Sequence, residues 1–191
     1  MVKIALNGFG RIGKLALRRL IDNDISVAFI NDKNGDPDLF AHLLEFDTVH
    51  GRWSRSISND SVSLTVDNQK IPVLHEENIV NLPLDEIDIV IDCTGFFKSE
   101  QLLAPYFNKG VQKVIVSAPV KTGSVANLVY GVNHNIYDPN MHNIVTAASC
   151  TTNCLAPIVN VVHESLGIKH GSITTIHNVT NTQTIVDRPS K

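Results

Sequence analysis

Three closely spaced glycines, Gly8, Gly10 and Gly13, constrain the fold of this chain more than any other feature. The apolar stretch before them, residues 2–7, is typical of a buried strand. The apolar spacing across residues 11–21 predicts a helix after them. A second apolar stretch, residues 25–30, completes a strand–helix–strand unit in about 30 residues. The glycine-rich turn therefore predicts the opening unit of a parallel α/β fold.

Further short apolar segments follow, and they alternate with helical ones. A hairpin is expected at residues 62–74, turning at Asp67 and Asn68. Ser99 is suited to cap a helix that runs to Asn108. The remaining strands are expected at residues 87–93, 114–117, 129–132 and 144–148. Strands that alternate with helices predict an α/β fold of the Rossmann type, with a doubly wound and mostly parallel sheet.

The pattern changes after Ser149. A long helix is predicted there, with Leu155, Val162 and Leu166 on one face and Gly167 at its end. A single strand, residues 172–177, should follow it. We therefore expect a dinucleotide-binding domain at residues 1–149 and the truncated start of an α+β catalytic domain at residues 150–191.

The glycine motif predicts a dinucleotide site, and each glycine has its own physical reason. Gly8 permits the tight turn, Gly10 lets the backbone approach a pyrophosphate, and Gly13 lets the helix pack on the strand. The helix start offers free N–H groups to phosphate. Asp32 lies 19 residues after Gly13, near the ~20 expected for a ribose-binding acid. A carboxylate would repel a 2′-phosphate, so NAD is favoured over NADP.

The second constellation is Ser149–Cys154, where a strand gives way to a helix. Cys150 would lie among unpaired helix N–H groups, which stabilise a thiolate and an oxyanion. A free cysteine is more often a small buried hydrophobe, but the polar neighbours of Cys150 argue against that. His177 is the best candidate for its base. Cys154 would have a supporting role, and Cys93 would be structural.

Composition excludes several classes of protein. The 16 Lys and Arg residues are dispersed and the net charge is −3, so no nucleic-acid surface is expected. No apolar run approaches the ~18 residues of a membrane span. Three cysteines without a secretory signal favour reduced thiols in the cytoplasm. The histidines show no metal-ligand spacing, and no metal site is expected.

Taken together, these motifs resemble a known family. The segments 7–13, 149–157 and 174–177 are similar to those of phosphorylating, NAD-dependent glyceraldehyde-3-phosphate dehydrogenase, and the resemblance covers all 191 residues. It implies that Cys150 is the nucleophile and His177 its base. It also implies a site for the cofactor, formed by Gly8, Gly10, Arg11, Ile12, Gly13, Asp32, Thr94, Gly95 and Ser117. Ser149 and Thr151 would hold inorganic phosphate, and Thr180 and Thr182 the phosphate of the substrate.

The implied reaction is the oxidative phosphorylation of glyceraldehyde 3-phosphate to 1,3-bisphosphoglycerate in glycolysis, by a cytoplasmic homotetramer. Residues 50–53, 146–150 and 180–184 are similar to dehydrogenases linked to arsenical resistance, so arsenate is an alternative acyl acceptor. A second alternative is a non-catalytic NAD-binding module, because we expect the 191-residue polypeptide alone to be inactive. A cysteine peptidase with a Cys150–His177 dyad is disfavoured by the Rossmann-type start.

Overall fold

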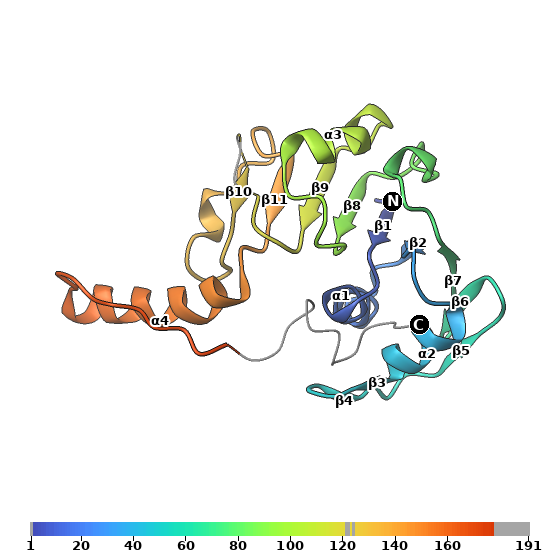
Figure 1. Cartoon of the computed structure of the whole chain (residues 1–191), viewed down its shortest axis with the longest axis horizontal. Helices are drawn as coiled ribbons and strands as arrows, with labels where there is room; N and C mark the ends of the chain where they lie inside the picture. Colours follow the sequence, from blue (N-terminus) through green and yellow to red (C-terminus); the bar gives the residue numbers. More distant parts are fainter. Residues whose placement is uncertain (1, 121–122, 124, 178–191) are drawn as a thin grey trace.

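The computed structural model describes residues 2–120, 123 and 125–177, and its strands form one large sheet and a small hairpin (Figure 1). The strands are β1 (Ile4–Asn7), β2 (Val27–Asn31), β3 (Phe46–Asp47), β4 (Gly51–Arg52), β5 (Ile57–Asn59), β6 (Ser63–Val66), β7 (Gln69–Leu74), β8 (Ile89–Asp92), β9 (Lys113–Val116), β10 (Ala126–Asn127) and β11 (Ile144–Thr146). The helices are α1 (Arg11–Asp22), α2 (Pro37–Glu45), α3 (Glu100–Asn108) and α4 (Cys150–Leu166), with 3₁₀ turns η1 (Ile79–Asn81) and η2 (His134–Ile136).

The order of the described strands in the large sheet is β10-β11-β9-β8-β1-β2-β7-β6-β5. Every pairing from β10 to β7 is parallel, and only β5–β6 and β6–β7 are antiparallel. The chain builds outward from β1 in one direction through β2 and then returns to β1's other side through β8. The carboxyl ends of β1 and β8 therefore form a topological switch point, which is where open α/β sheets bind ligands.

Helices cover both faces of this sheet. Neighbouring residues of β1 point to opposite faces, and Ala5 and Leu6 are buried in separate apolar clusters. The cluster around Leu6 includes Leu17 of α1 and Phe40 of α2. The cluster around Ala5 includes residues of α3. The predicted doubly wound, mostly parallel sheet is thus confirmed.

Local sequence explains where the helices begin. The side chain of Asp36 accepts a hydrogen bond from the Leu39 amide at 2.8 Å and caps α2. Ser99 caps α3 in the same way, as the sequence predicted. Gly10 precedes α1 and has no side chain with which to cap it. The start of α1 therefore has no side-chain cap, and a helix start of this kind is suited to an anionic ligand.

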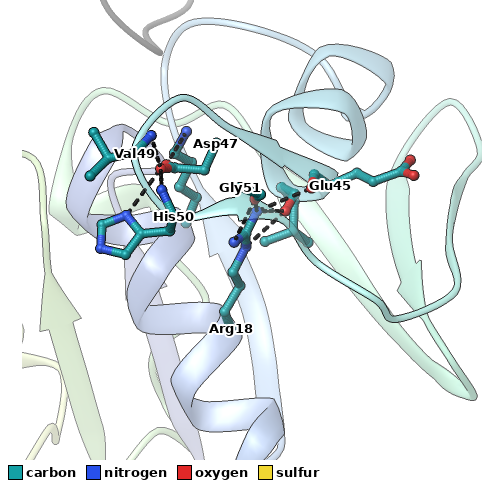
Figure 2. A network of polar contacts seen from close by, with 8 residues as sticks. Arg18, Glu45, Asp47, Val49, His50 and Gly51 are labelled. Atoms are coloured by element: carbon teal, nitrogen blue, oxygen red, sulfur yellow. Dashed lines mark hydrogen bonds and ion pairs between the residues drawn. The ribbon is translucent and has the colours of Figure 1, made fainter.

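A small hairpin, β3–β4, is fastened to α1 by buried polar groups. Arg18 donates from Nη1 and Nη2 to the carbonyl oxygen of Gly51 in β4, each at 3.3 Å. Lys14 Nζ lies 2.9 Å from Asp47 Oδ2, and the two side chains are 0% and 4% exposed. Figure 2 shows Asp47 also meeting the amides of Val49 and His50. Although burial raises its pKa, these hydrogen bonds together hold the pKa of Asp47 well below its usual range.

Two expected strands are wrong. Residues 129–132 form a turn, and the edge strand β10 lies just before them. The amide of Val132 donates to the carbonyl of Val129, and Gly131 has a φ of +87°. These backbone groups therefore form hydrogen bonds within a turn and not between strands. Residues 172–177 form no strand either and are exposed. An extended segment becomes a strand only beside a hydrogen-bonding partner, and no described strand pairs with it.

Helix α4 extends away from the sheet in Figure 1, and none of its residues is buried. Its apolar side chains include Ile158 and Leu166, which are 61% and 83% exposed. In the described part of the chain, no helix is both long and apolar enough to cross a lipid bilayer.

Candidate active site

A cleft of about 370 Å³ opens at the switch point of the sheet. Its lining includes Gly8, Gly10, Arg11, Asp32, Thr94 and Gly95, all of which the sequence assigned to the cofactor. Ile12, Gly13 and Ser117 are outside the lining. The structure therefore brings six of the nine expected cofactor residues to one cleft, and their contacts with a ligand stay a prediction.

The three glycines differ in what surrounds them. Gly8 has a φ of +93°, and a Cβ there would lie 2.5 Å from the backbone of Thr94. A Cβ on Gly13 would lie 2.0 Å from the carbonyl oxygen of Gly8, so its absence lets α1 pack on the turn. A Cβ on Gly10 would meet nothing within 4 Å. Gly10 thus leaves open space beside the first turn of α1, as a pyrophosphate requires.

Asp32 holds the glycine turn from the end of the neighbouring strand β2. Its Oδ2 accepts a hydrogen bond from the Phe9 amide at 2.7 Å, and its Oδ1 accepts one from the Asn34 amide at 3.0 Å. An ionised carboxylate has about four acceptor positions, so Asp32 keeps capacity for two ribose hydroxyls. The ribose role stays a prediction that this geometry permits.

Several residues of the cleft were not among those expected from the sequence. They are Asn7, Asn31, Lys33, Glu76 and Glu77, which also line it. Lys33 Nζ lies 2.7 Å from Glu77 Oε1. The usable signal was position, because Asn7 and Asn31 are polar residues at the carboxyl ends of buried strands.

Ser117 lies behind the cleft. Its amide donates to the carbonyl of Asp92 at 2.9 Å, and its side chain hydrogen-bonds Cys93. Burial, followed by the nearby charge of Asp92, raises the pKa of the Cys93 thiol to about 12. Cys93 is therefore a protonated wall residue, which agrees with the structural role predicted for it.

The predicted nucleophile and base lie together. Cys150 is the first residue of α4, and its Sγ lies 3.1 Å from Nε2 of His177. This hydrogen bond is the main cause of the lowered pKa of the Cys150 thiol. Burial opposes the shift, and hydrogen bonds from the Thr151 amide and hydroxyl reinforce it. The pair has the geometry of an activated thiol nucleophile.

The chain enters α4 through a strained turn that the sequence analysis did not foresee. Ala148 has a φ of +54°, which side chains other than glycine rarely adopt. Its amide donates to Thr146 Oγ1 at 3.1 Å. The side-chain amide of Asn153 spans the turn by donating to the carbonyls of Ala147 and Ser149 at 2.6 and 2.9 Å. Strain held from both sides is typical of functional sites, and here it sets the direction of Cys150.

The other expected substrate residues divide into two groups. Ser149 caps α4 by accepting from the Thr152 amide at 3.1 Å, and Thr151 contacts the Cys150 thiol. Both therefore lie beside the nucleophile, and phosphate binding by them stays a prediction. Thr180 and Thr182 lie outside the described residues.

The cleft and the Cys150–His177 pair share one edge of the sheet. Strands β1, β8, β9 and β11 are parallel, so their carboxyl ends point the same way. Cys150 follows the end of β11 by four residues, and the glycine turn follows β1 directly. Among the described residues, no group of three or more His, Cys, Asp and Glu side chains is placed to hold a metal ion.

Comparison with known proteins gives two family matches. The model for "Glyceraldehyde 3-phosphate dehydrogenase, NAD binding domain" matches residues 2–100, and the model for the "C-terminal domain" of the same enzyme matches residues 149–191. Curated glyceraldehyde-3-phosphate dehydrogenases are 48% identical in Nostoc, 44% in Geobacillus stearothermophilus and 41% in Saccharomyces cerevisiae. Each alignment covers all of this chain and 57% of the relative.

Proposed function

Because the chain belongs to the glyceraldehyde-3-phosphate dehydrogenase family, we propose that it oxidises glyceraldehyde 3-phosphate with NAD and transfers the acyl group to inorganic phosphate. The matched relatives lend no support to arsenate as the acceptor. The homotetramer implied by the resemblance and the cytoplasmic location favoured by the cysteine content stay predictions.

The observation that carries this proposal is the 3.1 Å contact between Cys150 Sγ and His177 Nε2 at the start of α4. It supplies a thiol with a lowered pKa, and the helix start supplies N–H groups for an oxyanion. The residues of the cleft fit NAD, because Gly10 has no side chain to cap α1 and a Cβ there would meet nothing within 4 Å, which leaves space for a pyrophosphate beside the helix start.

The chemistry follows from these groups. His177 accepts the thiol proton, and the Cys150 thiolate attacks the aldehyde carbon to form a C–S bond. The resulting oxyanion is stabilised at the helix start and takes that proton from His177 to give the hemithioacetal hydroxyl. His177 takes the hydroxyl proton as the carbonyl reforms. When bound, NAD supplies the acceptor for the hydride that leaves the same carbon. The product is a thioester on Cys150, which keeps the acyl group activated.

Phosphate then completes the cycle. A phosphate oxygen attacks the thioester carbon, the C–S bond breaks, and Cys150 leaves as the thiolate while the acyl phosphate departs. The lowered pKa of Cys150 assists this step too, because a thiol of low pKa is the better leaving group. Ser149 and Thr151 lie beside the sulfur and are the residues expected to hold the attacking phosphate.

The test is phosphate-dependent NADH formation from glyceraldehyde 3-phosphate, with mass spectrometry to detect an acyl group on Cys150. We expect Cys150→Ser to lower the rate by about three orders of magnitude or more, since it removes the nucleophile. Cys154→Ser is the matched control, because this exposed thiol lies on the same helix.

Comparable turnover by Cys150→Ser and the unaltered protein would contradict the mechanism. NADH binding without any NADH formation, with natural substrate and phosphate present, would instead favour the non-catalytic binding module. Turnover that arsenate supports and phosphate does not would return the acyl acceptor to the arsenate alternative.

A further inference from the structure

A row of buried polar side chains crosses the sheet beneath the cleft. Asn7, Asn31 and Asp92 end β1, β2 and β8, and they are 4%, 2% and 1% exposed. They are direct neighbours across the sheet, because Asn7 pairs with Asn31 on one side and with Asp92 on the other. Burying such groups is costly unless each finds hydrogen-bonding partners, so their partners define what the row does.

The partners form a hydrogen-bond chain with one direction. The Glu76 amide donates to Asn31 Oδ1 at 2.8 Å, and Asn31 Nδ2 donates to Asn7 Oδ1 at 2.7 Å. Asn7 Nδ2 donates to Tyr106 Oη at 2.6 Å, and Tyr106 Oη donates to Asp92 Oδ2 at 2.8 Å. The chain thus runs from the loop after β7, through α3, to the end of β8.

Asp92 is the last acceptor of this hydrogen-bond chain and also binds Thr94. Its Oδ1 accepts from the Thr94 amide at 3.0 Å and from the Thr94 hydroxyl at 2.7 Å. Burial raises the pKa of Asp92, while the hydrogen bonds from Thr94 and Tyr106 oppose that shift. Every one of these partners donates to Asp92, so the acceptor-only carboxylate is the form that satisfies them all. An asparagine in its place would have an NH₂ group, and this donor would face at least one of the groups that donate to Asp92.

The two ends of this hydrogen-bond chain lie on separate segments, because Glu76 follows β7, Thr94 follows β8, and β1 and β2 lie between these strands in the sheet. We call these two segments the Glu76 lip and the Thr94 lip of the cleft. Glu76 and Thr94 both line the cleft, whereas Tyr106 and Asp92 do not. The Thr94 backbone also lies against Gly8 of the glycine turn. The bond between Tyr106 and Asp92 is therefore the step that ties the Glu76 lip to the Thr94 lip, without itself reaching a ligand.

We propose that Tyr106 and Asp92 are positioning residues that hold the two lips at the separation a dinucleotide requires. The proposal rests on the proposed function, since it assumes that NAD occupies this cleft. A dinucleotide spans both lips, whereas a mononucleotide such as AMP can occupy the Asp32 and Glu76 side alone. Loss of the tie therefore weakens NADH binding more than AMP binding.

The experiment measures NADH and AMP binding by calorimetry in the full chain and in Tyr106→Phe, which keeps the ring in the core and removes the hydroxyl. The hydroxyl both accepts from Asn7 and donates to Asp92. Its removal leaves two buried groups unpaired, and we expect NADH to bind about tenfold more weakly, with AMP affinity changed less than about twofold. Asp92→Asn should have the same pattern.

Ile87→Val is the matched control, because Ile87 lies in the same apolar cluster as Tyr106 but before β8, opposite the cleft. It should leave both affinities unchanged. Equal weakening of NADH and AMP by Tyr106→Phe, or no weakening of NADH, would overturn the inference. Absence of NADH binding in the unaltered chain would overturn the proposed function first, and the inference with it.

If these variants fail to fold, amide hydrogen exchange in the unaltered chain tests the inference without any substitution. In the unaltered chain without ligand, the amides of Glu76 and Thr94 should both be protected from exchange, because each donates to a buried side chain in the row. Rapid exchange at both amides would refute a preformed tie between the lips.

Discussion

The glycine turn allows stability and ligand binding to be separated with two substitutions three residues apart. In Gly13→Ala the new Cβ would lie 2.0 Å from the Gly8 carbonyl oxygen and 3.0 Å from its carbon. Real Cβ atoms essentially never come within 3.0 Å of another group, so turn and helix must separate by roughly 1 Å. The atoms that the new methyl group would meet belong to the Gly8 backbone, so no flexible side chain can move aside to relieve the clash.

The expected cost follows from two opposing effects. Overpacking against fixed backbone costs about 3 kcal/mol, and Ala regains about 1 kcal/mol over Gly inside a helix. We therefore expect Gly13→Ala to lower the free energy of unfolding by about 2 kcal/mol or more, a large share of the ~5–15 kcal/mol that a folded domain has.

Gly10→Ala should have the opposite profile. Its φ of −79° and ψ of −155° suit any residue, and its Cβ meets nothing within 4 Å. Ala is a poorer helix cap than Gly by up to about 1 kcal/mol, which a less flexible unfolded chain offsets by about 0.4–1 kcal/mol. Stability should therefore change by less than about 1 kcal/mol.

The same methyl group would lie where the phosphate approaches the helix N–H groups. Loss of one charge-assisted hydrogen bond, worth about 1.5–3 kcal/mol, would weaken NADH binding by about ten- to a hundredfold. Urea unfolding followed by circular dichroism gives the stabilities, and NADH fluorescence titration gives the affinities. Equal destabilisation by both substitutions, or unchanged NADH affinity in Gly10→Ala, would refute this account of the turn.

Three further predictions concern charge. Replacing His177 by Asn should slow alkylation of Cys150 at neutral pH and raise the midpoint of its pH profile, because the histidine hydrogen bond lowers the thiol pKa; an unchanged profile would remove His177 as the activating group. Lys14→Met should cost about 3–5 kcal/mol, because it strands the buried charge of Asp47, whereas Lys33→Met at an exposed pair should cost less than about 1 kcal/mol. The folded pKa of Asp47 is depressed, so its contribution to stability is complete above about pH 5 and is lost as pH falls below about 4. Urea unfolding at several pH values measures this loss of stability, and the Asp47→Asn variant should not show it.

The sequence predicted the opening unit of the fold well because its determinants are local. The glycine turn, the Ser99 cap and the hairpin across Asp67 each involve residues a few positions apart, and the structure has all three. The strand at residues 129–132 failed for a related reason. Apolar composition favoured a strand, but the turn bonds at Gly131 competed successfully for the same backbone groups.

The Cys150–His177 contact could be proposed from the sequence, but its geometry could not be predicted. The two residues are 27 positions apart, and the strand expected to carry His177 is absent from the described residues. The contact lies instead between a helix start and an extended segment. Motif spacing predicted the chemistry of the pair, while its distance depends on backbone geometry that no local pattern encodes.

The buried polar row beside the cleft had a weaker sequence signal for a physical reason. Asn7, Asn31 and Asp92 each end a separate strand, and only the parallel register makes them neighbours. Tyr106 reaches the same row from α3 and looks in the sequence like an ordinary core aromatic. A polar residue at the carboxyl end of each central strand is therefore a sign of a shared buried network once the strand order is known.

The strained turn before α4 joins these observations to function. Ala148 takes a left-handed conformation at a cost of about 1–2 kcal/mol, and nothing in its side chain compensates. Asn153 holds the turn by bonding the carbonyls on either side of Ala148, and it lies within the polar hexapeptide 149–154 that marks the nucleophile. Two residues of that hexapeptide therefore have different roles. Cys150 is the nucleophile, and Asn153 fixes the turn so that Cys150 begins the helix and faces His177.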